Sequence, residues 1–341
     1  MTDHPSYKKH VLHADQFSRQ DMESLFTLSD QVRDLAKQRK HVNFLQNLLS
    51  HKRAMLYFVQ PSTRTFLSFQ SACQYLGMNC SEIRNPSTSS EAKGEAIEDA
   101  IRTFSSYVDM IIMRSPVAKL CEKIAKLLDT TPRSVPIINA GSGPDQHPTQ
   151  SLLDLYTLHR GFKDRGGIEN KTICLVGDLK RSRTVRSLSK LLTHYPKVHL
   201  IFSSPQAFAL KEDIRSEISQ ASSITFAETE HFLEAIEQAD AIYMTRIQDE
   251  WQLDSQDSPP SLDVTSRYHL KYEHLKSLMA HTIIMHPFPR RHEIDPKIDN
   301  DPRAHYWKQE RNGMWVRLAL IAQVMNVSNA IHSRWMEKDH I

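Results

Sequence analysis

The residues best suited to chemistry directly follow the apolar run 53-RAMLYFV-59, which is typical of a β-strand. Ligands of open α/β sheets bind at the carboxyl ends of strands, and a helix that starts there offers unpaired N–H groups and a partial positive charge. The segment 62-STRT-65 adds three hydroxyl groups and one full positive charge, from Ser62, Thr63, Thr65 and Arg64. We therefore predict a phosphate site here, although Ser and Thr are also ordinary helix N-cap residues.

Two further strand ends carry polar side chains that suit the same crevice. Arg114 closes the run 109-DMIIMR-114, and 146-QHPTQ-150 follows the run 135-VPIINA-140. His147 and Gln150 are three residues apart, so they share one face of a helix that Pro148 can begin. A lone histidine is more often structural, but its place at a third strand end favours contact with a ligand.

The second half of the chain repeats this pattern with arginines. Strand-like runs lead into 178-DLKRSRTV-185, 245-TRIQ-248 and 286-HPFPRR-291. The polar residues that these segments present are Arg183, Arg246 and Gln248. Arginine pairs bidentately with carboxylates, so the set suits a substrate with two carboxylates. A single arginine of this kind would more often form a surface ion pair.

The alternation of short apolar runs with longer helical patterns predicts an α/β fold with two doubly wound, mostly parallel sheets. The predicted strands are 53–59, 109–114, 135–139, 171–177, 197–204, 223–228, 240–245 and 282–286. A helix over 147–163 would join the halves, which sets the domains at 1–150 and 151–311. A last helical pattern, within 312–330, would return to the first domain.

Length and composition agree with two domains and exclude several classes of protein. The 341 residues exceed one ordinary core, and 43 Lys and Arg against 40 Asp and Glu leave a net charge of only +3. Without a basic stripe, nucleic-acid binding is not expected. The four cysteines lack C-x-x-C spacing, and no run approaches the roughly 20 apolar residues of a membrane span. With its polar start, the chain is predicted to be soluble and cytoplasmic.

Two segments are predicted to be loops with functional roles. The segment 84-RNPSTSSEAKGE-95 is rich in turn residues and predicts a mobile loop. The segment 249–266 is long and acidic and contains two adjacent prolines. Loops of that length are usually lids, binding loops or solvated insertions.

Over about residues 10–327, the chain resembles the aspartate and ornithine carbamoyltransferase family. The resemblance rests on seven motifs in order: STRT, SSEAKGE, MR, HPTQ, GDLKRSRTV, MTRIQ and HPFPR. Within the family, M-T-R-x-Q and H-P-x-P-R look like the aspartate enzymes, and the S-M-G motif of the ornithine enzymes is absent. The resemblance therefore implies carbamoyl transfer from carbamoyl phosphate to L-aspartate, in pyrimidine biosynthesis.

The resemblance also implies a role for each motif residue. The phosphate would be held by Ser62, Thr63, Arg64, Thr65, Arg114 and His147. The carbamoyl oxygen would be reached by Thr65, Arg114 and His147, and the carbamoyl NH2 by Gln150 and the carbonyls of Pro287 and Phe288. The aspartate carboxylates would be bound by Arg183, Arg246 and Gln248, with Lys93.

Assembly and cofactors follow from the same resemblance. Ser89 and Lys93 would enter the active site of a neighbouring subunit, which implies a homotrimer with shared active sites. No metal or organic cofactor is implied, because carbamoyl phosphate is already an activated mixed anhydride. Whether regulatory chains dock on the trimer is left open.

Some positions depart from the family pattern. Gln60 stands where the family usually has an acidic residue that pairs with arginines, so weaker domain closure or an altered aspartate dependence is expected. Phe66, Arg181 and Phe288 are also unusual. Two alternatives are kept: transfer to another amino acid, and a non-catalytic paralogue that serves as a binding or regulatory subunit. Arg64, His147 and Lys93 speak against the second.

Overall fold

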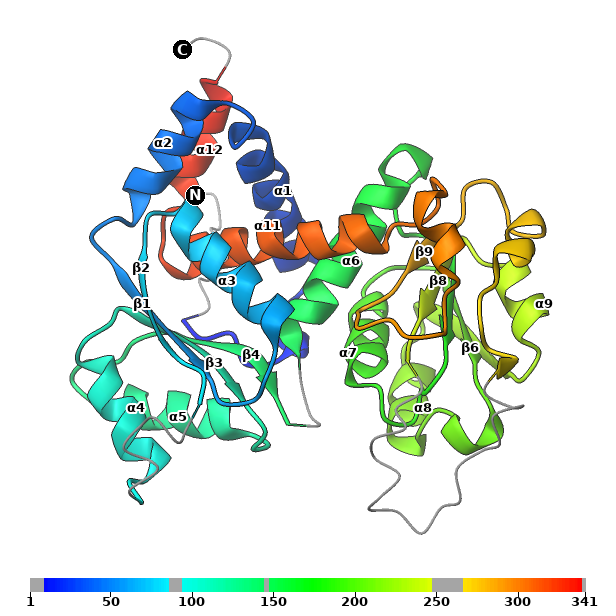
Figure 1. Cartoon of the computed structure of the whole chain (residues 1–341), viewed down its shortest axis with the longest axis horizontal. Helices are drawn as coiled ribbons and strands as arrows, with labels where there is room; N and C mark the ends of the chain where they lie inside the picture. The colour runs from blue at the N-terminus through cyan, green and yellow to red at the C-terminus, as the bar shows by residue number, and fades with distance from the viewer. Residues whose placement is uncertain (1–8, 86–93, 144–146, 247–265, 339–341) are drawn as a thin grey trace. The chain divides into compact units, whose positions relative to one another are not determined.

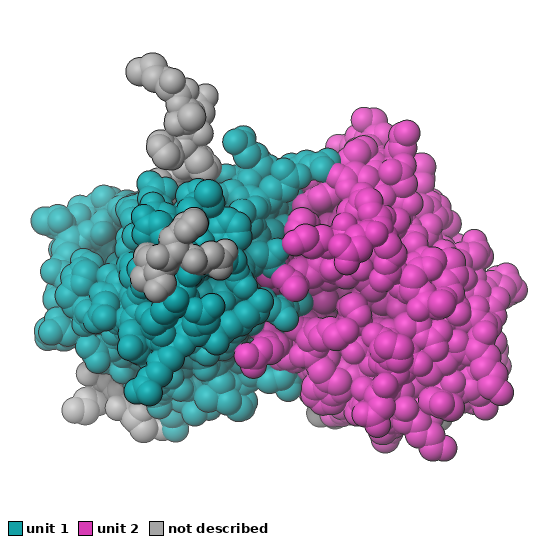
Figure 2. Space-filling model, turned by 90° about the horizontal axis from the view of Figure 1, so that it is seen from above, with its two compact units in different colours: residues 1–152, 312–341 teal, residues 153–311 magenta. Residues whose placement is uncertain are grey.

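The computed structural model describes residues 9–85, 94–143, 147–246 and 266–338. The chain divides into two compact units, Met1–Leu152 with Asn312–Ile341 and Leu153–Arg311, which Figure 2 shows in different colours. Each unit contains one parallel β-sheet with helices around it, so the predicted α/β class is confirmed (Figure 1).

The first unit is built on a four-stranded parallel sheet in the order β2-β1-β3-β4. Its strands are β1 (Arg53–Phe58), β2 (Asn79–Ile83), β3 (Met110–Ser115) and β4 (Ile137–Ser142). Its helices are α1 (Arg19–Leu35), α2 (Arg39–Leu48), α3 (Thr63–Tyr75), α4 (Ile97–Ser105), α5 (Leu120–Asp129), α12 (Ser328–Met336) and the short η1 (Ala14–Gln16). Two helices, α6 (Pro148–Phe162) and α11 (Tyr306–Val324), contain the points at which the chain divides.

Alternation along the strands of this sheet decides which helices cover each face. Met55 and Tyr57 of β1 pack with Ile111 of β3 in a buried cluster that includes residues of α4 and α5. On the other face, Phe58 meets Phe66 of α3 edge-on, with ring centroids 5.4 Å apart. Fully burying one such large apolar side chain contributes about 1.5–3 kcal/mol, so these clusters fix the strand register.

The second unit is built on a five-stranded parallel sheet in the order β7-β6-β5-β8-β9. Its strands are β5 (Thr172–Val176), β6 (Val198–Ser203), β7 (Ile224–Thr229), β8 (Ala241–Met244) and β9 (Ile283–Met285). Its α-helices are α7 (Arg183–Leu192), α8 (Glu212–Ser219) and α9 (Phe232–Glu237). Its short 3-10 helices are η4 (Lys163–Arg165), η5 (Gln206–Phe208), η7 (Tyr272–Lys276) and η8 (Pro296–Asn300).

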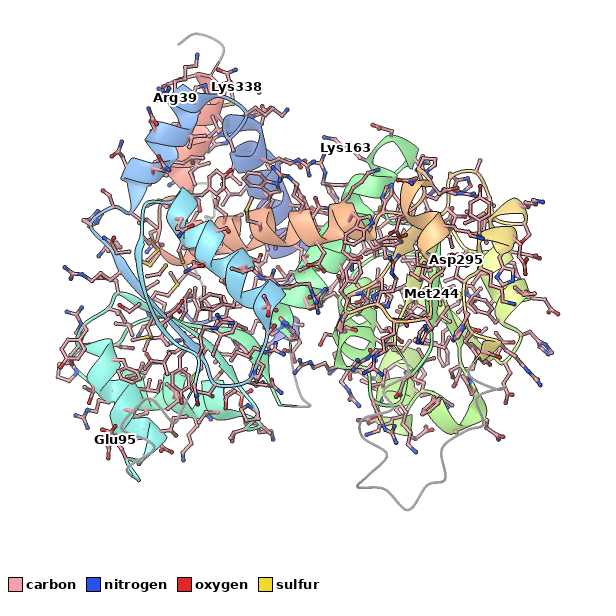
Figure 3. All side chains as sticks on the ribbon, viewed as in Figure 1. Arg39, Glu95, Lys163, Met244, Asp295 and Lys338 are labelled. Carbon is pink, nitrogen blue, oxygen red and sulfur yellow. The ribbon has the colours of Figure 1, made fainter. Side chains whose placement is uncertain are left out.

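The core of the second unit lies between its sheet and the segments that follow α9. Ile242 and Met244 of β8 are fully buried in a cluster with Ile236 of α9 and Tyr306 of α11. Figure 3 labels Met244, the last residue of β8 and thus the start of one of the predicted site loops.

The predicted strands are all present, with small differences at their ends, and β2 is an additional strand. Helix α3 starts at Thr63, so three of the four STRT residues lie in the helix rather than before it. Helix α11 starts at Tyr306, earlier than the predicted pattern. No single helix of the described residues is long and apolar enough to span a membrane; α11 and α12 pass that test only together, and the chain bends by 116° between them.

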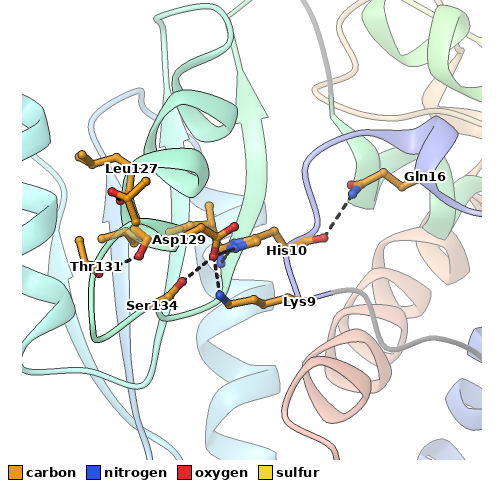
Figure 4. A network of polar contacts seen from close by, with 10 residues as sticks. Lys9, His10, Gln16, Leu127, Asp129, Thr131 and Ser134 are labelled. Carbon is orange, nitrogen blue, oxygen red and sulfur yellow. Dashed lines mark hydrogen bonds and ion pairs between the residues drawn. The ribbon is translucent and has the colours of Figure 1, made fainter.

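The N-terminal segment is held to the first unit by a polar network around Asp129, at the end of α5 (Figure 4). The Asp129 carboxylate accepts hydrogen bonds from Lys9, from His10 Nε2 at 3.2 Å and from Ser134 Oγ at 2.7 Å. His10 Nδ1 in turn accepts the backbone N–H of Ile137 at 3.1 Å, which joins the segment to β4.

Candidate active site

The sheet order of the first unit places the STRT segment at a topological switch point. The chain leaves β1 for β2 on one side of the sheet and continues to β3 on the other, so β1 and β3 are neighbours. The crevice outside the carboxyl ends of such a strand pair is where open α/β sheets bind ligands. Residues 62–65 follow β1 there, and Arg114 lies opposite Phe58, the last residue of β1.

Ser62 occupies the N-cap position of α3, but its side chain makes no capping hydrogen bond. The first turn of this helix contains no acidic side chain and includes the exposed Arg64. A helix start carries up to four N–H groups without intrahelical partners and a partial positive charge, which an adjacent cation makes still more attractive to an anion. The ordinary-cap explanation for Ser62 therefore does not hold, and an anion site is favoured.

Arg114, His147 and Gln150 are each less than a tenth exposed. Arg114 Nη1 donates to the Ala140 carbonyl at 3.0 Å and lies 3.4 Å from His147 Nε2. Guanidinium groups have no acceptor, so the His147 Nε2 that faces Arg114 is the unprotonated ring nitrogen. A buried guanidinium beside an imidazole suits an oxygen atom that carries or develops negative charge.

Gly141 makes room for this pair at the end of β4. Its φ is +123°, and a Cβ built on it would lie 2.5 Å from Arg114 Nη1. Any side chain here would therefore displace the guanidinium, so the glycine is required by the position of Arg114.

Gln60 lies between the end of β1 and the start of α3 and is half-buried. Its Oε1 is buried and accepts no hydrogen bond from the residues that the structure describes. A buried amide oxygen without a donor costs about 1–3 kcal/mol. The position is therefore suited to a ligand or to a side chain that approaches when a ligand is bound.

The second unit has its own switch point, between β5 and β8. β5 leads into α7 through residues 177–182, and Arg183 is the first residue of that helix. Ser182 is the N-cap, and its hydroxyl accepts the Val185 N–H at 3.3 Å. Burial lowers the pKa of the Arg183 guanidinium from its ordinary value, as expected for a cation partly removed from water.

The neighbouring strand β8 leads into Thr245 and Arg246. Thr245 anchors this exit, because its N–H and its hydroxyl both donate to the Val176 carbonyl of β5, at 2.8 and 2.7 Å. Gly177 permits this approach, since a Cβ there would lie 2.4 Å from the Thr245 carbonyl oxygen. Arg183 and Arg246 thus follow strand ends, as predicted, and the structure shows that the two strands are neighbours.

The turn after β9 carries Pro287 and Phe288. Phe288 has a φ of +50°, which is rare for a bulky residue, and its N–H donates to His286 Nδ1 at 2.8 Å. Its ring packs against Tyr306 and Trp307, with centroids 5.9 and 5.0 Å away. The surrounding structure thus imposes one backbone conformation on this turn and fixes the direction of its carbonyl groups.

The predicted site residues therefore fall into three sets. The first unit places 62–65 and Arg114 at the ends of neighbouring strands and brings Arg114 beside His147, three residues before Gln150, and the second unit places Arg183, Arg246 and the 287–288 turn at strand ends. Ser89, Lys93 and Gln248 lie outside the described residues, as does most of the loop at 249–266. Among the residues described, no group of three or more His, Cys, Asp or Glu side chains is placed to hold a metal ion.

Comparison with protein families identifies both halves of the chain. Residues 9–160 match the carbamoyl-P binding domain of aspartate/ornithine carbamoyltransferases, and residues 169–324 match the Asp/Orn binding domain of the same enzymes.

Individual relatives agree along most of the chain. The aspartate carbamoyltransferase catalytic subunit of Clostridium acetobutylicum is 38% identical over 311 residues, 91% of this chain and 96% of that protein. Aspartate carbamoyltransferase 1 of Pisum sativum, a chloroplastic protein, is 36% identical over 91% of this chain and 77% of its own length.

Solved structures show the same fold. The catalytic subunit of M. jannaschii aspartate transcarbamoylase superposes with a TM-score of 0.79 at 34% identity, covering 94% of this chain and 98% of that one. The Trypanosoma cruzi enzyme in complex with carbamoyl phosphate and aspartate gives a TM-score of 0.81 at 32% identity, covering 93% and 95% of the two chains. With both domains matched in order and relatives aligned almost end to end, the chain belongs to the aspartate/ornithine carbamoyltransferase family.

Proposed function

We propose that this protein is an enzyme that transfers the carbamoyl group of carbamoyl phosphate to the amino group of L-aspartate, giving N-carbamoyl-L-aspartate and phosphate in pyrimidine biosynthesis. The observation that carries the proposal is the β1–β3 switch point, where the uncapped start of α3, with Arg64, follows one strand and Arg114, paired with His147, ends the neighbouring strand. Relatives named aspartate carbamoyltransferase, and a related structure with both substrates bound, support the choice of substrates.

In the first unit, the phosphate group is assigned to the start of α3 and the two buried side chains near it. The residues assigned to it are Ser62, Thr63, Arg64, Thr65, Arg114 and His147. Thr65, Arg114 and His147 also contact the carbamoyl oxygen in this proposal, and Gln150 the carbamoyl NH2 group. The buried cation then lies where negative charge develops on that oxygen.

In the second unit, Arg183, Arg246 and Gln248 bind the aspartate carboxylates, and Lys93 assists them. The carbonyl groups of Pro287 and Phe288 accept hydrogen bonds from the carbamoyl NH2, which suits a turn whose backbone is held rigidly. An amino acid with a cationic or apolar side chain would need a different pocket from one lined by two arginines, so transfer to ornithine is disfavoured.

The reaction needs positioning and charge stabilisation rather than a protein nucleophile. The aspartate amine adds to the carbamoyl carbon, and the carbonyl electrons move to oxygen, where the Arg114 guanidinium stabilises the negative charge. Collapse of this intermediate breaks the C–O bond to phosphate. The departing phosphate takes up the proton lost by the amine, so no side chain is assigned as a general base.

We also propose a cytoplasmic homotrimer in which Ser89 and Lys93 enter the active site of the neighbouring subunit. Regulatory chains that dock on the trimer would form a larger assembly. The mass of the purified protein, and of the complexes captured from cell extract, distinguishes a trimer from a monomer and from such an assembly.

The proposed reaction is tested by supplying carbamoyl phosphate with L-aspartate, with L-ornithine or with buffer alone, and by measuring the ureido product colorimetrically. Product with aspartate alone, abolished by Arg64→Ala, is the expected result. No product with either amine, from folded protein that still binds carbamoyl phosphate, would instead indicate a non-catalytic binding paralogue.

A further inference from the structure

The second unit contains a fully buried carboxylate that has no role in the reaction described above. Asp154 lies on α6 among apolar neighbours and is 0% exposed. Its Oδ2 accepts the Tyr243 hydroxyl at 2.6 Å, and its Oδ1 accepts Gln309 Nε2 at 2.6 Å. Burying a carboxylate is costly, and an apolar side chain of similar size is often no less stable. Stability alone therefore does not account for an acidic residue here.

The contact with Asp154 fixes the orientation of the Gln309 amide. The carboxylate only accepts hydrogen bonds, so it must face the NH2 group of Gln309. The amide oxygen then points the other way and accepts the backbone N–H of His286 at 2.9 Å. Because that N–H can only donate, a Gln309 turned the other way would leave two donors facing each other.

The ring of His286 is hydrogen-bonded to the turn that carries Pro287 and Phe288. Its Nδ1 accepts the Phe288 N–H at 2.8 Å, and its Nε2 donates to Glu293 Oε1 at 2.7 Å. Glu293 Oε2 accepts the Arg291 N–H at 3.1 Å, on the far side of the turn. Although burial raises the pKa of Glu293, hydrogen bonds from His286 and from backbone N–H groups outweigh it and lower that pKa. Both ends of the turn are thus hydrogen-bonded to the His286–Glu293 pair, and the backbone of His286 is held by the amide that Asp154 orients.

The other oxygen of Asp154 connects to the strand that leads to Arg246. Tyr243 lies on β8, three residues before Arg246, and it pairs with Leu175 of the neighbouring strand β5. Burial, followed by the charge of Asp154 and its hydrogen bond, raises the pKa of Tyr243 well above its ordinary value. The phenol therefore stays protonated and continues to donate to Asp154.

We infer that Asp154 is a positioning residue for carbamoyl transfer: it orients Gln309 and Tyr243, and through them the turn that carries Pro287 and Phe288 and the end of the strand that leads to Arg246. The inference rests on the proposed function, because these are the groups assigned to the carbamoyl NH2 and to aspartate. Asp154 touches no substrate atom and acts only through its neighbours.

The test uses isosteric variants that reverse the order of donors and acceptors. Asp154→Asn places an NH2 group against Gln309 or Tyr243, and Gln309→Glu places a second carboxylate against Asp154. In the double variant Asp154→Asn with Gln309→Glu, the NH2 group of the introduced asparagine donates to the new carboxylate, which still accepts the His286 N–H. The double variant therefore restores each hydrogen bond that links Tyr243, residue 154, residue 309 and His286, and the negative charge lies at position 309 instead of position 154.

Each single variant is expected to lower kcat/KM for aspartate on the order of 10²-fold, the effect of a misplacement of about 1 Å. Inhibition by inorganic phosphate is expected to change less than about twofold in the single variants, because the phosphate site is assigned to the first unit. The double variant is expected to have a kcat/KM at least about tenfold higher than the single variants. If Asp154→Asn does not fold, Tyr243→Phe decides: a KM for aspartate raised roughly threefold supports the inference, and a wild-type KM overturns it.

Lower thermal stability with wild-type kcat and KM would show a purely structural role and overturn the inference. A double variant no better than the worse single variant would also overturn it. These results remain distinct from failure of the proposed function, in which the wild-type protein itself forms no carbamoyl aspartate.

Discussion

Helices α3 and α7 both start at the carboxyl end of a strand, and both carry an arginine in the first turn, yet their N-termini differ. Ser182 caps α7 by accepting the Val185 N–H, whereas Ser62 makes no capping bond in α3. Because helix N–H groups seek acceptors, the start of α3 is suited to bind an anion, while α7 supplies its own acceptor. We therefore assign phosphate to the N-terminus of α3, whereas Arg183 at the start of α7 is expected to bind through its side chain alone.

The two sites also differ in how their residues are held. Residues 62–65 are consecutive and are placed by one strand–helix junction. In the second unit, the 287–288 turn and the strand that leads to Arg246 are held by hydrogen bonds between distant segments, with Tyr243 and Gln309 separated from Asp154 by 89 and 155 positions. Substitutions near the first site should therefore act locally, and those in the second unit should act at a distance.

The largest effect is expected from removing the cation at the start of α3. Arg64→Ala should lower kcat/KM by about 10³-fold or more, because the phosphate group loses a charged partner both when carbamoyl phosphate binds and when the phosphate departs. Steady-state kinetics with varied carbamoyl phosphate measures this. Arg39→Ala, at an exposed arginine on α2 that Figure 3 labels, is the matched control. An equal loss of kcat/KM in the Arg64→Ala and Arg39→Ala variants would contradict the assignment of phosphate to the start of α3.

Removing the arginine at the start of α7 should affect aspartate alone. Arg183→Ala loses a charge-assisted contact of about 2–3 kcal/mol, so KM for aspartate should rise roughly 10²-fold while phosphate inhibition is unchanged. Arg186→Ala, on the same helix and paired with Asp213 at 2.8 Å, should behave as wild type. If Arg183→Ala weakened phosphate inhibition as strongly as it weakened aspartate binding, the division of roles between the helices would be wrong.

An intermediate effect is expected at Gln60, which lies directly before the uncapped start of α3. Gln60→Glu replaces a neutral acceptor with a charged one, and charge-assisted hydrogen bonds are about twice as strong, a gain of about 1 kcal/mol or roughly fivefold in equilibrium. We expect a shift of that size in KM for aspartate. Gln60→Met gives a control that keeps the length of the side chain but no acceptor. Identical aspartate saturation in the Gln60→Glu variant and the wild type would count against a role for this position.

The smallest effect is expected far from both sites, at Asp129. Hydrogen bonds from Lys9 and Ser134 lower the pKa of Asp129, so its contribution to stability is complete above the unfolded pKa of about 3.9 and is lost as the pH falls through the folded value. The carboxylate is about half exposed, so Asp129→Asn should cost at most about 1 kcal/mol at pH 7. Urea unfolding at pH 7 and pH 3 should show this cost shrinking on acidification.

Asp164→Asn, at an exposed carboxylate in the second unit, gives the baseline for that comparison. A difference between the Asp129 and Asp164 variants that stayed constant with pH would show that the charge on Asp129 does not stabilise the fold.

Local sequence was sufficient to find the strands with apolar runs and the polar segments that follow them. It did not identify β2, because Asn79–Ile83 is an edge strand with mostly exposed polar side chains and lacks an apolar pattern. It also gave no strand order. The positions of the STRT segment and of Arg183 at switch points depend on which strands are neighbours, and that depends on contacts between distant segments.

The role inferred for Asp154 was not predicted either, although a signal was present. A single carboxylate interrupts the apolar residues Leu152, Leu153, Leu155 and Tyr156 of a buried helix. Such a residue must find partners in the interior, but its partners Tyr243 and Gln309 are recognisable only once the fold is known. The sequence could indicate that a buried polar contact exists, but not what it positions.

Transfer of the carbamoyl group to L-aspartate can be followed by supplying carbamoyl phosphate labelled with 13C at the carbonyl and measuring product and phosphate together by NMR. We predict that the label appears in N-carbamoyl-L-aspartate, with one phosphate released for each molecule formed and no label transferred to ornithine. Phosphate release without labelled carbamoyl aspartate would show that the enzyme hydrolyses carbamoyl phosphate and does not transfer the carbamoyl group to aspartate.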